Sequence, residues 1–76
     1  MSYSATYYTS GPNTSVGVID NNTKQEVFRF IVPGGIVSAW CHNMEQPDTV
    51  TVTRLDGIVE TWRISTRTRI SQTRYG

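Results

Sequence analysis

The sequence predicts a small α+β domain, with an antiparallel β-sheet of four to five strands in two hairpins and one short helix around residues 37–46. Three observations support this fold class. Two stretches rich in β-branched and aromatic residues each enclose a turn signal, which is typical of β-hairpins. A third stretch carries apolar residues at helical spacing. The 76 residues suit a single domain, residues 1–76, whose core is close to the smallest that is stable alone.

The N-terminal segment, residues 1–10, contains three tyrosines among serines and threonines. This composition predicts an edge strand or an arm that docks by its tyrosines. A Gly-Pro-Asn turn signal then ends the segment.

The first hairpin is expected within residues 14–32, around an Asn-Asn-Thr turn. Pairing Val18 with Glu26 would gather one apolar face. That face consists of Val16, Val18, Phe28, Phe30 and Val32. Val27 and Ile31 point to the other side, so the second strand of this hairpin is predicted to be central in the sheet or covered.

The segment from residue 36 to residue 46 allows two interpretations. As a helix, it places most of its apolar residues on one arc, and Pro47 ends it because the residue before a proline is biased away from helical geometry. The arc contains Ile36, Val37, Ala39, Trp40, Cys41 and Met44. As a strand, the segment separates apolar from polar residues poorly, although Ile36 and Val37 are weak helix formers. The helix is preferred; the strand would make a six-stranded, all-β meander closing into a small barrel.

The second hairpin surrounds Asp56-Gly57, the strongest turn signal in the chain. A two-residue loop there would divide the apolar residues between both faces. A three-residue loop with Gly57 in the left-handed region pairs Val50 with Trp62 and gathers them on one face. That face holds Val50, Val52, Ile58, Trp62, Ile64 and Ile70. The longer loop is therefore predicted.

Two features of this hairpin need partners. Glu60 falls on the apolar face, where Arg54 is its expected partner. The second strand, residues 58–70, is thirteen residues long, while residues 49–54 supply six. Because unpaired backbone of that length must find another strand, the N-terminal segment or a second copy of the chain is expected to pair with it, and a homo-oligomer is predicted.

The arginines are the predicted partner-binding site. Residues 54–76 hold five arginines against two carboxylates, a local net charge of +3 in a chain whose total is +1. Alternate residues of a strand project to one face, so three of these arginines should form a row that can grip carboxylates or phosphates. The row is Arg63, Arg67 and Arg69, with Arg54 and Arg74 near its ends. The structural alternative is a solvated face whose charges prevent aggregation.

Other chemistry is poorly represented. With one cysteine and one histidine, a single copy can form neither an internal disulfide nor an ordinary zinc site. Cys41 and His42 are adjacent, so their side chains diverge and cannot act as nucleophile and base. Trp40 and Trp62 are expected to anchor the core. No catalytic residue, cofactor site or metal site is predicted.

The predicted function is a non-catalytic binding or assembly module that acts through protein contacts, such as a small accessory or inhibitor-type protein. The alternative is a nucleic-acid-binding domain using the arginine-rich strand, although the pI of 7.9 is below the value of about 9 typical of such domains. An enzyme completed between subunits is a third hypothesis. The chain has no apolar run of membrane-spanning length and no signal-peptide pattern, so a cytoplasmic protein is expected.

Overall fold

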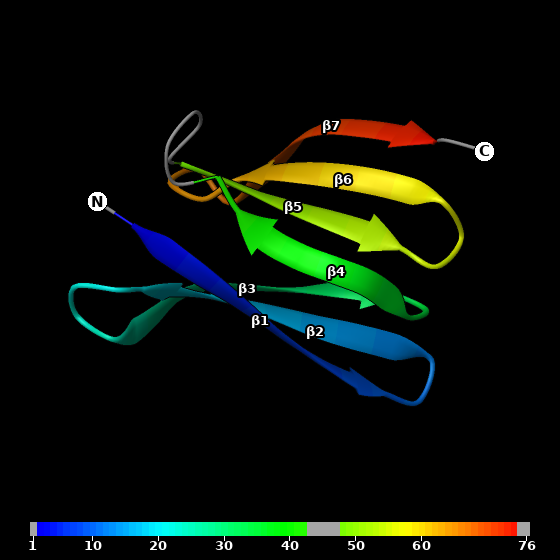
Figure 1. Ribbon diagram of the computed structural model, residues 1–76, viewed down its shortest axis with the longest axis horizontal. Coiled ribbons are helices and arrows are strands. Elements are labelled where there is room, and N and C mark those ends of the chain that lie inside the picture. The colour runs from blue at the N-terminus through cyan, green and yellow to red at the C-terminus, as the bar shows by residue number, and fades with distance from the viewer. Residues whose placement is uncertain (1, 43–47, 75–76) are drawn as a thin grey trace.

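The computed structural model describes residues 2–42 and 48–74, which form seven strands in two antiparallel sheets (Figure 1). The strands are β1 (Tyr3–Ser10), β2 (Asn13–Asp20), β3 (Gln25–Pro33), β4 (Ile36–Cys41), β5 (Thr49–Arg54), β6 (Ile58–Arg63) and β7 (Thr68–Arg74). The first three form one sheet in chain order, and the last four form the other. In the described residues the architecture is all-β, so the predicted α+β class is wrong, and the two sheets do not close into the alternative barrel.

The predicted helix is replaced by β4, which pairs with β5. Ala39 lies opposite Val52 and Cys41 opposite Val50, so these two small side chains point towards the core. Trp40 points away and stays 49% exposed. The helical arc was misleading because it counted Trp40 as buried, whereas β-branched residues at the start of the segment favour a strand. The rest of the predicted helix, residues 43–46, lies outside the described residues.

The first hairpin buries the predicted apolar face with a different register. Val18 lies opposite Phe28 instead of Glu26, a shift of two residues, and the five predicted apolar residues stay on the buried face. Glu26 instead pairs with Ile19, and Val27, predicted to point outward, packs against the core. One residue of the shift comes from the turn, where Lys24 has a φ of 63° and its N–H donates to the Asp20 carbonyl oxygen at 2.7 Å. The other comes from a bulge that leaves Val27 unpaired between Glu26 and Phe28. β3 is an edge strand, so the prediction of a central strand is also wrong; β2 is the central one.

The second hairpin has the predicted register. Val50 lies opposite Trp62 and Val52 opposite Glu60. Gly57 has a φ of 89° and donates its N–H to the Arg54 carbonyl oxygen at 3.1 Å. The three-residue turn inferred from the distribution of apolar residues is therefore confirmed.

The long strand predicted over residues 58–70 does not exist. β6 ends at Arg63, and the chain reverses through a turn in which Arg67 has a φ of 57°. β7 then runs back along β6. Ile70 is the extra residue of a bulge in β7 and is 45% exposed, so its assignment to the apolar face is wrong. The predicted homo-oligomer loses its structural basis, because β7 supplies the strand that a second copy was expected to provide.

The core lies between the two sheets. Val16, Val18, Val50 and Val52 are fully buried in it. The Trp62 ring stacks on Phe30 with 4.5 Å between ring centroids and packs against the core, as predicted. The stack also joins the two sheets, because Phe30 belongs to β3 and Trp62 to β6. Along the front of the molecule, β1 lies beside β4 (Figure 1).

Candidate functional site

The strand edges of the two sheets differ in what covers them. β1 and β4 lie against each other (Figure 1). The β3 edge receives a hydrogen bond from Arg67, whose Nη2 lies 3.3 Å from the Val27 carbonyl oxygen. β7 pairs with β6 alone in the described part of the chain, and all seven of its residues are exposed. β7 is therefore the edge that a partner can reach.

Arg67 acts as a bridge between the sheets. It sits in the turn after β6 and donates to the backbone of β3. Its side chain also lines an open groove of about 350 Å³ together with Glu26, Val27, Phe28 and Arg29. Because Arg67 occupies a carbonyl of the β3 edge, it protects that edge from another strand.

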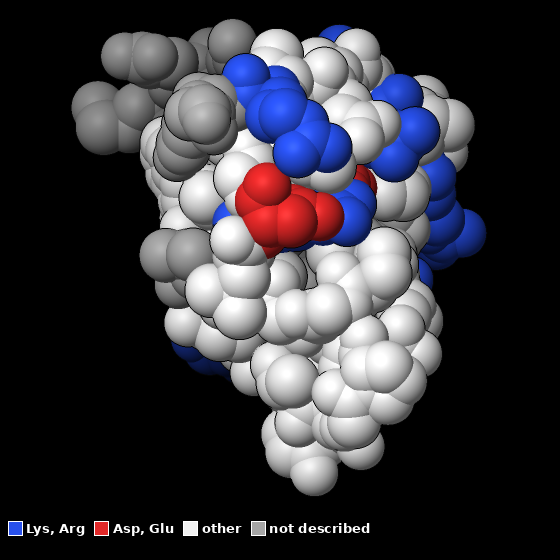
Figure 2. Space-filling model, turned by 90° about the vertical axis from the view of Figure 1, so that its right-hand side faces the viewer, with Lys and Arg blue, Asp and Glu red and all other residues white. Residues whose placement is uncertain are grey.

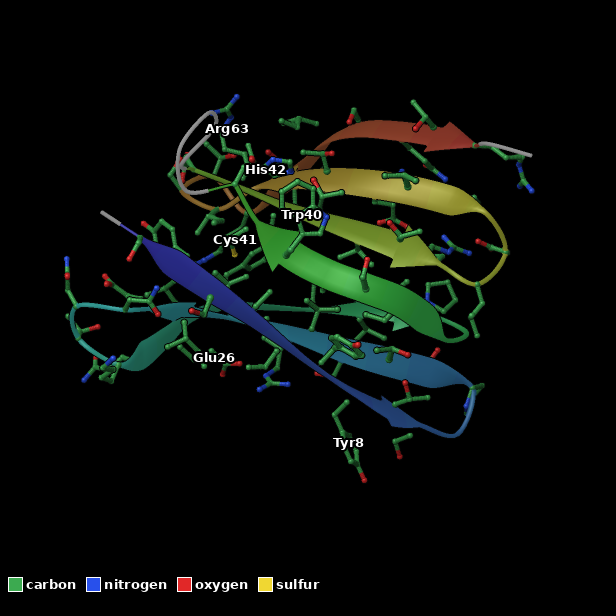
Figure 3. The ribbon with its side chains drawn as sticks, viewed as in Figure 1. Tyr8, Glu26, Trp40, Cys41, His42 and Arg63 are labelled. Atoms are coloured by element: carbon green, nitrogen blue, oxygen red, sulfur yellow. The ribbon has the colours of Figure 1, made fainter. Side chains whose placement is uncertain are left out.

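Arg63 lies on the opposite face of the sheet from Arg69. Arg69 is directly across from Trp62, and neighbouring residues of β6 point to opposite faces. The Arg63 Nη1 is 3.7 Å from Asp48 Oδ2, an exposed ion pair. Figure 3 shows Arg63 at the same end of the molecule as Cys41 and His42. The predicted row of three arginines on one strand is thus not formed.

Arg69 and Arg74 are brought together on one face of β7. Arg69 lies opposite Trp62, and Arg74 lies opposite Ile58, so both share the core-side face of the four-stranded sheet. The smaller three-stranded sheet ends at β3, and these positions of β7 remain exposed. We call Arg69 and Arg74 the β7 arginine pair.

The β7 arginine pair borders a buried carboxylate, Glu60, whose side chain is only 4% exposed. Glu60 accepts hydrogen bonds from Arg54 Nη1 at 2.9 Å and Trp62 Nε1 at 3.0 Å, which confirms its predicted pairing with Arg54. Arg69 Nη1 is 3.9 Å from Glu60 Oε1. Glu60 is therefore satisfied by Arg54 and Trp62, and Arg69 adds a longer, weaker contact.

Arg54 lies beneath the edge rather than on it. Its side chain is 14% exposed and pairs both with Glu60 and, at 2.5 Å, with Asp56. The hydrogen bond with Glu60 raises the pKa of Arg54, although desolvation opposes this, and the bond with Asp56 adds to it. Arg54 thus has both of its guanidinium nitrogens Nη1 and Nη2 engaged inside the molecule.

Asp56 completes this charged cluster at the β5–β6 turn. Desolvation would raise the pKa of Asp56, but its hydrogen bonds from the Ile58 N–H and Arg54, with the charges of Arg54 and Arg74, lower it below its usual value. Figure 2 shows the face at this end of the molecule, where acidic atoms lie between basic ones with an uncharged surface below them. The five residues of the cluster are Arg54, Asp56, Glu60, Arg69 and Arg74. Its balance is three cations against two anions.

The outer face of the three-stranded sheet carries a second exposed surface. Tyr8 lies opposite Ser15, which in turn lies opposite Ile31, so the three form a row across the sheet. Tyr8 is 70% and Ile31 59% exposed. Figure 3 shows Tyr8 projecting away from the body of the molecule. This row was not anticipated, because the sequence pattern predicted that Ile31 would be covered.

Cys41 and His42 face different surroundings (Figure 3). Cys41 packs against the core, and burial raises the pKa of its thiol to about 11. His42 Nε2 instead lies 2.5 Å from Thr51 Oγ1, and its ring contacts Trp40 at 3.7 Å between centroids. The two side chains diverge as expected from their adjacency, and Trp40 is a surface residue rather than the predicted core anchor.

Residues 2–42 and 48–74 form neither a cluster of metal-ligating side chains nor a membrane-spanning helix. No group of three or more histidine, cysteine, aspartate or glutamate side chains is placed to hold a metal ion there. The same residues contain no helix of the length and apolarity needed to cross a membrane.

Asp48 has a structural role that the sequence did not reveal. Its carboxylate accepts hydrogen bonds from the Ser65 N–H at 2.9 Å and the Ser65 hydroxyl at 2.5 Å. Its carbonyl oxygen accepts from the Ile64 N–H at 2.8 Å. Asp48 thereby holds the turn that reverses the chain into β7. Because Asp48 and Ser65 are 17 residues apart, no local pattern links them.

Comparison of the chain with protein-family models, with curated proteins and with solved structures found no match.

Proposed function

We propose that this protein is a non-catalytic binding module that attaches to an acidic protein surface through the β7 arginine pair. The observation that carries the proposal is the exposed β7 edge with two cations on one face. Glu60 next to them already accepts hydrogen bonds from Arg54 and Trp62. The pair can therefore bind carboxylates from outside without leaving a buried charge uncompensated.

Nucleic acid is the weaker alternative. Tight binding to a phosphate backbone needs several cations on one surface. Here Arg63 faces the other way, Arg54 is engaged by two carboxylates and Arg67 donates to the backbone of β3. Two arginines on β7 suit a short acidic stretch of protein better than an extended polyanion.

Self-association is better accommodated away from β7. Pairing of β7 with β7 from a second copy would bring arginines together, and like charges on neighbouring strands repel. The exposed row of Tyr8 and Ile31 supplies apolar surface instead. If the protein does self-associate, replacing both residues by serine should lower the mass measured by light scattering, whereas replacing the β7 arginine pair should not.

The proposed function can be tested with poly-glutamate as a probe. Arg69→Ser with Arg74→Ser should weaken binding about tenfold, since two exposed ion pairs of about 0.7 kcal/mol each are lost. The matched control is Arg29→Ser with Arg63→Ser, which removes the same charge from exposed pairs elsewhere. Equal affinities of the two double variants would show that net charge, not the β7 arginine pair, drives binding.

The same variants separate the alternative function. The unsubstituted protein should be released from a single-stranded oligonucleotide at low salt, whereas tight retention with a steep salt dependence would favour nucleic acid. Thermal melts of both double variants should match that of the unsubstituted protein, because exposed substitutions rarely change stability by more than about 0.5 kcal/mol.

A further inference from the structure

We infer that the partner contributes an extended acidic segment that adds to the four-stranded sheet as a strand beside β7. This inference rests on the proposed function and specifies how the acidic partner binds. An exposed sheet edge recognises an extended chain through its main-chain N–H and C=O groups, and side chains of the edge then select the sequence.

The backbone of β7 leaves a regular stretch for such pairing. The bulge at Ile70 interrupts the ladder near the start of the strand, where edges are commonly blunted. Beyond it, residues 71–74 pair in unbroken register with residues 58–61. In an antiparallel ladder every second residue directs both backbone groups to the same side. Within residues 71–74, alternate residues therefore present their N–H and C=O groups on the side away from β6.

The side chains of β7 specify which segment fits. Gln72 and Arg74 lie on the core-side face, and so does Arg69 on the other side of the bulge. Ser71 and Thr73 occupy the opposite face. Residues directly across a strand pair have Cβ atoms about 4.5–5.5 Å apart. An added strand should therefore carry carboxylates at every second position, facing Arg69 and Arg74. Small or β-branched residues suit the positions between them.

The alternatives for this edge fit less well. A second β7 strand would place its own arginines beside these. The β3 edge is less available because Arg67 occupies the Val27 carbonyl oxygen. The excess positive charge of the cluster complements an acidic strand, since its three cations outnumber its two anions.

The test uses a synthetic peptide of alternating glutamate and threonine and two N-methylated forms of it. One form is methylated at every glutamate nitrogen and the other at every threonine nitrogen, so that charge and sequence are unchanged. In strand addition one form loses its N–H groups towards β7 and the other loses those facing solvent. One methylated peptide should bind at least tenfold more weakly than the unmodified peptide, and the other should bind almost as well.

Amide hydrogen exchange gives an independent readout. The unmodified peptide should slow exchange at alternate amides of residues 71–74 and leave the amides of β1 unchanged. Equal binding of all three peptides, or equal loss with both methylated forms, would overturn strand addition. The proposed function would survive that result if Arg69→Ser with Arg74→Ser still weakened the unmodified peptide relative to Arg29→Ser with Arg63→Ser.

Failure of the proposed function has a different signature. The unmodified peptide would then bind Arg69→Ser with Arg74→Ser and its matched control equally. That result would exclude both the proposed function and strand addition beside β7. Displacement of the peptide by a single-stranded oligonucleotide, with a steep dependence on salt, would assign the edge to nucleic acid instead and would also overturn the inference.

Discussion

The β5–β6 and β6–β7 hairpins share a strand but differ in almost every other respect. β5 contributes fully buried valines to the core, whereas every residue of β7 is exposed. The β5–β6 hairpin turns at Gly57, and the β6–β7 hairpin turns through Arg67. Asp48 accepts hydrogen bonds from the start of the β6–β7 turn, and Arg67 donates one to β3. β6 thus pairs with a core strand, β5, on one side and with an accessible edge strand, β7, on the other. Substitutions in β5 and its turn to β6 should mainly cost stability, and those in β7 should mainly cost binding.

The largest effect is expected at Trp62, on the shared strand. Trp62→Ala should lower the free energy of unfolding by about 3–5 kcal/mol, because it removes the stack on Phe30 and a donor to the buried Glu60. Urea denaturation measures the loss. Trp40→Ala is the matched control, since Trp40 is exposed, and it should cost much less. Similar losses in the two variants would contradict the assignment of Trp62 to the core.

Gly57 should have the next largest effect. Gly57→Val should destabilise by about 1–3 kcal/mol, because a β-branched residue is strained at a φ of 89°. Thermal unfolding measures the change. Gly57→Asn should cost less, since asparagine tolerates positive φ better than other non-glycine residues. If valine and asparagine were tolerated equally, the turn would not depend on the left-handed conformation.

Asp48 tests the β6–β7 hairpin. Asp48→Ala should destabilise by about 0.5–1.5 kcal/mol, since it removes the acceptor of the Ser65 N–H. Hydrogen exchange should become faster in β7 before it does in β5, because the lost contact holds the β6–β7 turn. Asp48→Asn keeps one acceptor oxygen and should retain part of the protection. Uniform acceleration over both hairpins would show that they do not open separately.

The smallest effect is expected at Arg67. Arg67→Gly should change stability by less than about 0.5 kcal/mol, because relief of the left-handed strain offsets the lost bond to Val27 and the greater freedom of the unfolded chain. Arg67→Ala keeps the strain and loses the bond, so its melting temperature should be lower than that of Arg67→Gly. The reverse order would mean that φ contributes little at this turn.

The two hairpins also differ in how far the sequence predicts them. Gly57 follows an aspartate between two β-branched runs, so its turn and the register of β5 with β6 could be derived from local sequence. Lys24 and Arg67 adopt positive φ without being glycine or asparagine, and nothing in their neighbourhood signals this. The turn at Lys24 and the bulge at Val27 together shift the register of the first hairpin by two residues. The turn at Arg67 reverses the chain where a continuous strand was predicted.

The candidate site was only partly predictable for the same reason. The pairing of Glu60 with Arg54 followed from the correct register of the second hairpin. The row of Arg63, Arg67 and Arg69 depended on a continuous strand that the turn at residues 64–67 interrupts. The grouping of Arg69 with Arg74 requires knowledge of both the reversal and the bulge at Ile70, which are set by tertiary contacts.

The order of strands within the two sheets has a consequence for how the chain folds. Every strand pair joins neighbours in the sequence, and the sheets are connected between Pro33 and Ile36 by two residues. Hairpins between consecutive strands close short loops, which cost little chain entropy and form on a timescale of microseconds. The stack of Phe30 on Trp62 instead joins residues that are 32 positions apart. We therefore expect two meanders to form early, and their docking to set the folding rate.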